Sequence, residues 1–177
     1  DIAVFAKTIS NGFPMGAVIG NRLTMEAAQT SFISSAYWTE GVGPAAAVAS
    51  ISKMKILDVP SHLNKIGTQF LSGWRELGEK YQLPVTCGGR PEITQVGFDH
   101  TEANSLMTLF TTRMLNSGFI ASSAFNPTWA HQPRHVSAFL QAAEPVFEEI
   151  TEALEKNDIG QRINHKPKHT GFARLVE

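Results

Sequence analysis

The segment Asp1-Ile-Ala-Val-Phe-Ala-Lys7-Thr-Ile-Ser-Asn-Gly12-Phe-Pro-Met-Gly16-Ala-Val-Ile-Gly20 is the most informative part of the chain, because one lysine stands there between an apolar run and a glycine-rich turn. The run Ile2 to Ala6 has no polar side chain, which predicts a strand buried on both faces. In an α/β protein such a strand indicates a parallel sheet. Ligands bind at the carboxyl ends of these strands, so Lys7 is expected at a cleft.

Lys7 is the candidate nucleophile of the chain. A lysine at such a position is partly desolvated, which favours the neutral amine, and a neutral amine attacks a carbonyl to form a Schiff base. Lys7 alone among the lysines follows an all-apolar run, and Asn11-Gly12 then supplies a turn. The alternative interpretation is a lysine that ends a strand at the surface and has no chemical role.

The segment from Phe5 to Ala17 resembles the lysine motif of the class III pyridoxal-phosphate-dependent aminotransferases, a fold type I family that includes glutamate-1-semialdehyde aminomutase. In that family a Gly-x-Pro-x-Gly-Ala stretch follows the lysine at this spacing, as Gly12-Phe-Pro-Met-Gly16-Ala17 does here. The resemblance implies that Lys7 binds the aldehyde of pyridoxal 5'-phosphate. It further implies that Lys7 acts as the base that moves a proton between the substrate and the cofactor.

A second segment, Tyr37-Trp-Thr39-Glu-Gly41-Val-Gly43-Pro44-Ala-Ala46, looks like the family's Thr-x-x-Gly-Asn-Pro-x-Ala element. The resemblance makes Thr39 a phosphate ligand that reaches the cofactor of the neighbouring subunit, and so implies a homodimer. Independently, Pro44 suits the first turn of a helix, and the amino end of a helix attracts anions. The alternative is that Thr39 and the glycines only shape a tight turn.

The resemblance extends more weakly to Gly118-Phe-Ile120 and Ser122-Ser-Ala-Phe125, which look like a small-domain strand and loop. It predicts an α/β fold, with residues 1–57 as the end of a large-domain mixed sheet and residues 58–177 as a C-terminal α+β small domain. Enzymes of the family are longer, and their other cofactor-binding groups precede the lysine. The chain is therefore expected to be the C-terminal part of a larger enzyme, inactive by itself.

The regular elements follow from the apolar periodicity. In residues 1–57 it predicts strands at 17–20 and 32–36 and helices at 24–30 and 44–57. In residues 58–177 it predicts a helix from 58 to about 81, a hairpin of 85–87 with 93–98, and a helix from 101 that stops at Gly118. A returning strand at 119–121 and a long helix over 136–154, kinked or divided by Pro145, complete the small domain.

Composition excludes several other classes of protein. The chain has 177 residues, of which 42% are hydrophobic, so it can bury a core, and a net charge of -1 argues against nucleic-acid binding. Its single cysteine, Cys87, cannot form an internal disulfide, which favours a reducing, cytoplasmic compartment. No apolar run reaches membrane-spanning length.

Four histidines and two loop residues are weaker candidates. His131 and His135, and likewise His165 and His169, are four residues apart, a spacing that binds metals on a helix. Proline interrupts both pairs and no other ligand has suitable spacing, so no metal site is predicted. The loop Asn126-Pro-Thr-Trp129 is the segment that the resemblance would bring toward the substrate entrance, and the alternative is a simple turn. Trp129 and Arg134 are the candidates there.

Two enzymatic functions remain open on the sequence alone. One is an aminotransferase that acts on a small-molecule amino donor and a keto or aldehyde acceptor. The other is an aminomutase that moves the amino group within one molecule. A third possibility, of a different class, is a non-catalytic interaction protein that keeps the fold.

Overall fold

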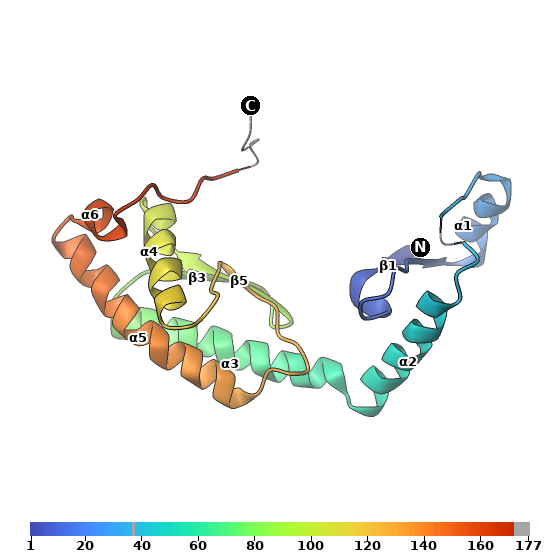
Figure 1. The fold of residues 1–177 in the computed structure, drawn as a ribbon, viewed down its shortest axis with the longest axis horizontal. Helices are drawn as coiled ribbons and strands as arrows, with labels where there is room; N and C mark the ends of the chain where they lie inside the picture. The colour runs from blue at the N-terminus through green and yellow to red at the C-terminus, as the bar shows by residue number, and fades with distance from the viewer. Residues whose placement is uncertain (37, 172–177) are drawn as a thin grey trace. The chain divides into compact units, whose positions relative to one another are not determined.

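The computed structural model describes residues 1–36 and 38–171 (Figure 1). Tyr37 and the end of the tail, residues 172–177, lie outside the described residues. The chain divides into two compact units, Asp1–Val59 and Pro60–Glu177. The assignment of residues 1–57 to a large domain and 58–177 to a small domain stays a prediction. Among the described residues, no helix has both the length and the apolar character needed to cross a membrane.

The first unit contains a two-stranded sheet of β1 (Ile2–Phe5) and β2 (Ala17–Gly20). The two strands are antiparallel, with Ile2 opposite Gly20 and Phe5 opposite Ala17. The sequence predicted a parallel partner for the first strand, and for its pairing with β2 this is wrong. An apolar run indicates burial of a strand, but it does not indicate whether the neighbouring strand is parallel or antiparallel. The expected burial is also wrong: Val4 is 71% exposed, because no described residue covers that face.

Helices complete the first unit. A short helix, α1 (Arg22–Glu26), begins after Asn21, whose Oδ1 accepts the Thr24 backbone N–H at 2.9 Å, and it continues into the 3-10 turn η2 (Ala27–Thr30). The segment 32–36 contains no strand, contrary to the prediction. It has no described neighbouring strand to pair with, and the ring of Phe32 is exposed. Helix α2 (Val42–Ile56) follows, close to the predicted bounds.

The second unit is a sheet covered on one face by helices (Figure 1). The strands β3 (Val85–Arg90), β4 (Ile93–Phe98) and β5 (Ala124–Phe125) are antiparallel neighbours in that order. Thr94, Val96 and Phe98 point to the buried face, while Gln95 is exposed on the other, as the predicted alternation requires. The helices are α3 (Val59–Lys80), α4 (Ala103–Asn116), α5 (Pro133–Glu155) and α6 (Ile159–Ile163).

One predicted element of the second unit differs from the structure, and for another element one of two predicted alternatives is excluded. The returning strand is at Ala124–Phe125 and not at 119–121. Gly118 ends α4 in a Schellman motif, and because Phe119 is part of that motif it does not begin a strand. There the Phe119 N–H donates to the Met114 carbonyl at 2.8 Å, and the Gly118 N–H to the Leu115 carbonyl at 3.0 Å. Helix α5 runs through Pro145 without a division.

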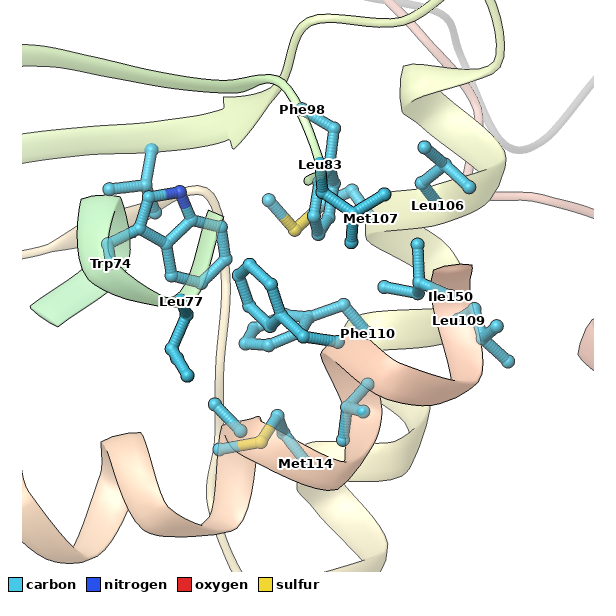
Figure 2. Close-up of a cluster of buried hydrophobic side chains, with 14 of the residues drawn as sticks. Trp74, Leu77, Leu83, Phe98, Leu106, Met107, Leu109, Phe110, Met114 and Ile150 are labelled. Carbon is cyan, nitrogen blue, oxygen red and sulfur yellow. The ribbon is translucent and has the colours of Figure 1, made fainter. Parts of the chain in front are cut away.

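The core of the second unit is an aromatic cluster centred on Trp74 of α3 (Figure 2). Trp74 is completely buried and meets Phe110 of α4 and Phe147 of α5 edge to face, at 5.1 and 5.0 Å between ring centroids. Its Nε1–H donates to the Gly97 carbonyl at 3.4 Å, which satisfies the one polar atom of the ring. The three helices and β4 are thus stabilised by one shared set of contacts.

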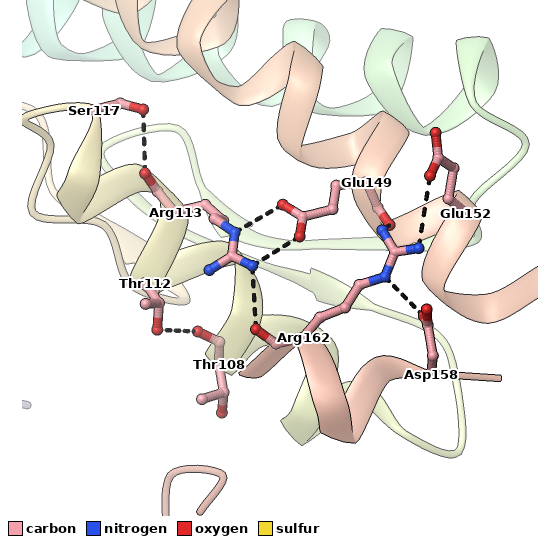
Figure 3. A network of polar contacts seen from close by, with 8 residues as sticks. All are labelled: Thr108, Thr112, Arg113, Ser117, Glu149, Glu152, Asp158 and Arg162. Carbon is pink, nitrogen blue, oxygen red and sulfur yellow. Dashed lines mark hydrogen bonds and ion pairs between the residues drawn. The ribbon is translucent and has the colours of Figure 1, made fainter. Parts of the chain in front are cut away.

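An ion-pair network joins α4, α5 and α6 (Figure 3). The guanidinium of Arg113 binds both carboxylate oxygens of Glu149 at 2.8 Å and also donates to the Arg162 carbonyl at 3.1 Å. Arg162 in turn donates to Asp158 at 2.7 Å and pairs with Glu152 at 3.6 Å. The hydrogen bond to Glu149 raises the pKa of Arg113 above its usual value. These contacts hold the short helix α6 against the two longer ones.

Candidate functional site

Lys7 lies one residue beyond β1, after Ala6, and is the first residue of the 3-10 turn η1 (Lys7–Ile9). Its φ of 57° lies in the left-handed region, which a lysine adopts only when its surroundings require it. The side chain is exposed, and it forms no hydrogen bond or ion pair with residues 1–36 or 38–171. The described residues therefore supply the expected place of the amine at a strand end, but not the expected desolvation.

The segment after Lys7 is a series of overlapping turns. The Ile9 N–H donates to the Ala6 carbonyl and the Asn11 N–H to the Thr8 carbonyl, both at 3.3 Å. Asn11 and Gly12 then both take positive φ, 47° and 106°, which confirms the turn expected at this pair. The chain reverses there and enters β2 as the second strand of the hairpin.

Thr39 lies two residues before the N-cap of α2, Gly41, and its side chain is exposed. The backbone N–H groups at this helix end could bind an anion, but not all of them are available. Glu40 Oε1 accepts the Val42 N–H at 3.0 Å, and Pro44 has no N–H to offer. The Thr39 hydroxyl and the N–H groups of Gly41 and Gly43 are among the donors here that make no hydrogen bond to another described residue.

The two motif segments meet. The backbone of Gly43, in the first turn of α2, lies so close to Pro14 that a Cβ atom there would stand 2.8 Å from the Pro14 carbonyl oxygen. A pocket of about 400 Å³ lies between the segments and is lined by residues of both: Pro14, Met15, Gly16, Ser35, Trp38, Glu40 and Pro44. Neither Lys7 nor Thr39 lines this pocket. The fold thus joins the backbones of the two motifs without joining their reactive side chains.

Sequence reasoning missed Ser10 and Glu40 in this region. Ser10 is 1% exposed, although it is a polar residue in a unit whose apolar side chains are mostly exposed. Nothing in the sequence distinguishes it from other serines in turns. Glu40 could have been found, since an acidic residue just before a helix often accepts a free N–H of the first turn.

The weaker candidates lie in the second unit. The ring of Trp129 contacts that of His62 of α3 in a tilted arrangement, with 4.7 Å between centroids and 56° between planes. Arg134 Nε donates to His135 Nε2 at 3.3 Å. His131 and His135 line an apolar cavity of about 520 Å³ together with rings such as Phe70. In residues 1–36 and 38–171, no three histidine, cysteine or acidic side chains are grouped so as to hold a metal ion.

His131 is held by its loop. Its Nδ1 accepts the Thr128 N–H at 2.9 Å, and its carbonyl oxygen lies 2.9 Å from His62 Nε2. Burial lowers the pKa of His131 below its usual value, and the charges that His135 and His62 can carry lower it further. The neutral ring therefore keeps its hydrogen on Nε2, because Nδ1 is the acceptor.

The known proteins to which the chain is similar are enzymes that transfer amino groups. No family profile matches the chain. The aminopentol aminotransferase of Sphingopyxis macrogoltabida is 23% identical over 158 residues, which cover 89% of this chain and 35% of that protein. The glutamate-1-semialdehyde 2,1-aminomutase of Ruminiclostridium cellulolyticum is 26% identical over 175 residues, which cover 88% of this chain and 40% of that protein. The chain thus spans 35% to 40% of the length of these curated relatives.

Solved structures agree on the fold. The Sphingopyxis FumI protein, solved in its PLP internal aldimine form, superposes with a TM-score of 0.79 at 19% identity, over 88% of this chain and 38% of that one. An omega-transaminase from Sphaerobacter thermophilus superposes with a TM-score of 0.72 at 16% identity, over 85% of this chain and 39% of that one. The chain therefore has part of the fold type I architecture, and its homologues are class III aminotransferases and aminomutases.

Proposed function

We propose that this chain is the C-terminal part of a pyridoxal-phosphate-dependent class III aminotransferase, with Lys7 as the residue that bonds to the cofactor and Thr39 as a phosphate ligand. The observation that carries the proposal is the contact between the two motif segments at Gly43 and Pro14. Two segments that resemble cofactor-binding motifs, separated by residues 18–36, which the resemblance does not constrain, pack against each other in the fold. The relatives are enzymes that transfer amino groups.

The side chains present fit the chemistry of the cofactor. An exposed primary amine after β1 suits an aldehyde. A hydroxyl two residues before the N-cap of α2, together with a Gly43 N–H that no described residue accepts, suits a phosphate. Glu40 opposes the second fit, because its carboxylate occupies the Val42 N–H and carries negative charge. In the proposed enzyme Glu40 turns away from the helix end when phosphate binds.

Pyridoxal phosphate, when bound, supplies a conjugated ring that accepts the electrons released as a substrate C–H bond breaks. Lys7 has two roles. With the cofactor bound, Lys7 Nζ would hold it through its aldehyde carbon, whose oxygen leaves as water, and the substrate amine would take the place of Nζ. The freed Nζ would then be the base that holds the proton taken from the substrate carbon. Thr39 Oγ1 would hold the phosphate in place.

The substrates are a small-molecule amino donor and a keto or aldehyde acceptor. A second candidate is intramolecular amino transfer, which the aminomutases among the relatives favour. The homodimer, in which Thr39 serves the partner's cofactor, and the cytoplasmic location remain part of the proposal. They rest on the resemblance and, for the compartment, on the single cysteine. Residues 1–177 alone are expected to be inactive.

Covalent trapping tests the proposal. The full-length protein is incubated with pyridoxal phosphate, reduced with borohydride and digested, and the labelled peptide is identified by mass spectrometry. We expect one label, on Lys7, and none in the variant Lys7→Ala. The control is Lys53→Ala in the last turn of α2, which should leave the label on Lys7 unchanged. If Lys7 remains unlabelled while the protein is folded, the chain is a non-catalytic protein that only keeps the fold.

A further inference from the structure

Ser10 is an unusual residue in the first unit. In the described part of Asp1–Val59 only Ser10, Gly43 and Ala47 are buried, whereas apolar side chains such as Phe5 and Ile19 are exposed. Buried hydroxyl groups need a hydrogen-bond partner, and Ser10 Oγ donates to the Phe13 carbonyl oxygen of the same turn. The turn thus contains a buried polar group whose hydrogen bond lies within the turn itself.

That hydrogen bond closes the turn in which the backbone is most constrained. The Phe13 N–H also points back to the Ser10 carbonyl, at 3.5 Å, which is a weak bond by itself. Between them Asn11 and Gly12 have left-handed backbones, and such a conformation costs a non-glycine residue free energy that the surroundings must offset. The hydrogen bond from the Ser10 hydroxyl therefore closes this turn more firmly than the long backbone hydrogen bond from Phe13 does.

The turn fixes positions on both sides of itself. On its carboxyl side it delivers the Pro14 carbonyl to the backbone of Gly43, the point where the two motifs meet. On its amino side the Asn11 N–H bonds to the Thr8 carbonyl, and Thr8 adjoins Lys7, which is itself left-handed. No residue among 1–36 and 38–171 forms a hydrogen bond or ion pair with the Lys7 side chain, so its direction depends on this backbone.

We infer that Ser10 is a positioning residue for Lys7: its hydrogen bond to Phe13 holds the turn that directs the Lys7 amine toward the cofactor aldehyde. The inference rests on the proposed function. It predicts that loss of the Ser10 hydroxyl impairs formation of the C=N bond between Lys7 Nζ and the aldehyde carbon, a step in which the aldehyde oxygen leaves as water. Phosphate binding, which uses Thr39, is unaffected.

The experiment compares two ligands in the full-length protein. Pyridoxal phosphate can bond to Lys7, whereas pyridoxamine phosphate carries the same ring and phosphate but no aldehyde. We expect Ser10→Ala to raise the Kd for pyridoxal phosphate about twofold to tenfold, the effect of one lost hydrogen bond, and to leave the Kd for pyridoxamine phosphate unchanged. Ser10→Cys keeps the size with a weaker donor and should lie between the two, which gives a second measurement if the alanine variant unfolds.

Ser31→Ala is the matched control, because Ser31 Oγ also donates to a backbone carbonyl, that of Ala27, at 2.8 Å in the same unit. It should change neither Kd. Equal weakening of both ligands by Ser10→Ala would make Ser10 merely structural, and no weakening of either would also overturn the inference. If the unchanged protein does not bond pyridoxal phosphate at Lys7, the proposed function itself fails, and the inference fails with it.

Discussion

The backbones of Gly43 and Pro14 are so close that no side chain fits between them: a Cβ atom on Gly43 would lie 2.8 Å from the Pro14 carbonyl oxygen and 3.2 Å from Met15 Cβ. Gly43 is in the first turn of α2, and Pro14 follows the turn after Lys7. The two motif segments can therefore approach this closely only because residue 43 is a glycine and has no Cβ atom.

Replacing Gly43 by alanine should separate the segments. Because the nearest atom is backbone, it cannot rotate aside, and we expect Gly43→Ala to lower the free energy of unfolding by about 1–3 kcal/mol. The affinity for pyridoxal phosphate should fall with it. The control is Gly41→Ala, whose Cβ would meet nothing within 4 Å. Equal thermal unfolding of the two variants would contradict the close contact.

Much of the second unit could be predicted from the sequence, because its helices and strands bury their apolar faces against one another within this chain. The stripe that contains Ile66, Phe70 and Trp74 is buried in α3, and the alternation of 93–98 is that of β4. The end of α4 followed from Gly118. The position of the short strand β5 did not, since two residues carry no periodicity.

The first unit was harder to predict, for a physical reason. An apolar strand such as Ile2–Phe5 signals burial, but the sequence does not say which partner covers it, and no described residue does. The two motif segments could be recognised, because the spacing of their glycines and prolines can be seen in the sequence. Their meeting at Gly43 could not, because a contact between turns leaves no periodic pattern.

Thr39 is predicted to act through the phosphate. The variant Thr39→Val keeps the shape of the side chain but removes its hydroxyl, so it should weaken pyridoxal phosphate binding about tenfold, the loss expected for a hydrogen bond to a charged group. Binding of pyridoxal, which has no phosphate, should not change. Titration of both ligands measures the difference, and equal weakening would assign Thr39 to the loop instead.

Glu40 is predicted to compete with the same phosphate. Its carboxylate accepts the Val42 N–H in this structure, and Glu40→Gln removes the negative charge while keeping a side-chain acceptor. We therefore expect tighter binding of pyridoxal phosphate to Glu40→Gln, with the larger gain at low ionic strength, where charges are less screened. Unchanged affinity at all salt concentrations would show that Glu40 already lies away from the phosphate.

His131 should make the stability of the second unit depend on pH. Its pKa is lowered in the folded chain, chiefly by burial, so the unfolded chain takes up this proton first as the pH falls. The stabilisation is complete above the unfolded pKa of about 6.5 and is lost as the pH falls from there through the folded value. Protonation also places a hydrogen on Nδ1, which then cannot accept the Thr128 N–H.

Urea unfolding between pH 7.5 and 5.5, a range of about one unit on each side of the usual histidine pKa, measures this dependence. The variant His131→Asn keeps an acceptor in place of Nδ1 but does not titrate, so its stability should fall less than that of the unchanged chain. Parallel curves for the two proteins would assign the pH dependence to other groups.

The bidentate pair of Arg113 and Glu149 should stabilise the second unit more than an exposed ion pair does. Both side chains are only about a third exposed or less, at 30% and 26%, and Glu149 accepts two charge-assisted hydrogen bonds. Glu149→Gln should lower the free energy of unfolding by about 1–3 kcal/mol, because Arg113 loses its charged partner. Lys156→Met removes the exposed pair with Glu152 and should lower the free energy of unfolding clearly less than Glu149→Gln does.

Gly67 of α3 should be the least replaceable glycine of the second unit. A Cβ atom there would lie 1.7 Å from the carbonyl oxygen of Pro91, in the turn between β3 and β4, and neither backbone can give way without moving the helix from the sheet. We expect Gly67→Ala to lower the free energy of unfolding by about 3 kcal/mol, at the upper end for overpacking. Gly160→Ala in α6, where nothing lies within 4 Å, should be neutral or slightly stabilising. Denaturant unfolding of the two variants decides, and similar midpoints would mean that α3 does not pack on this turn.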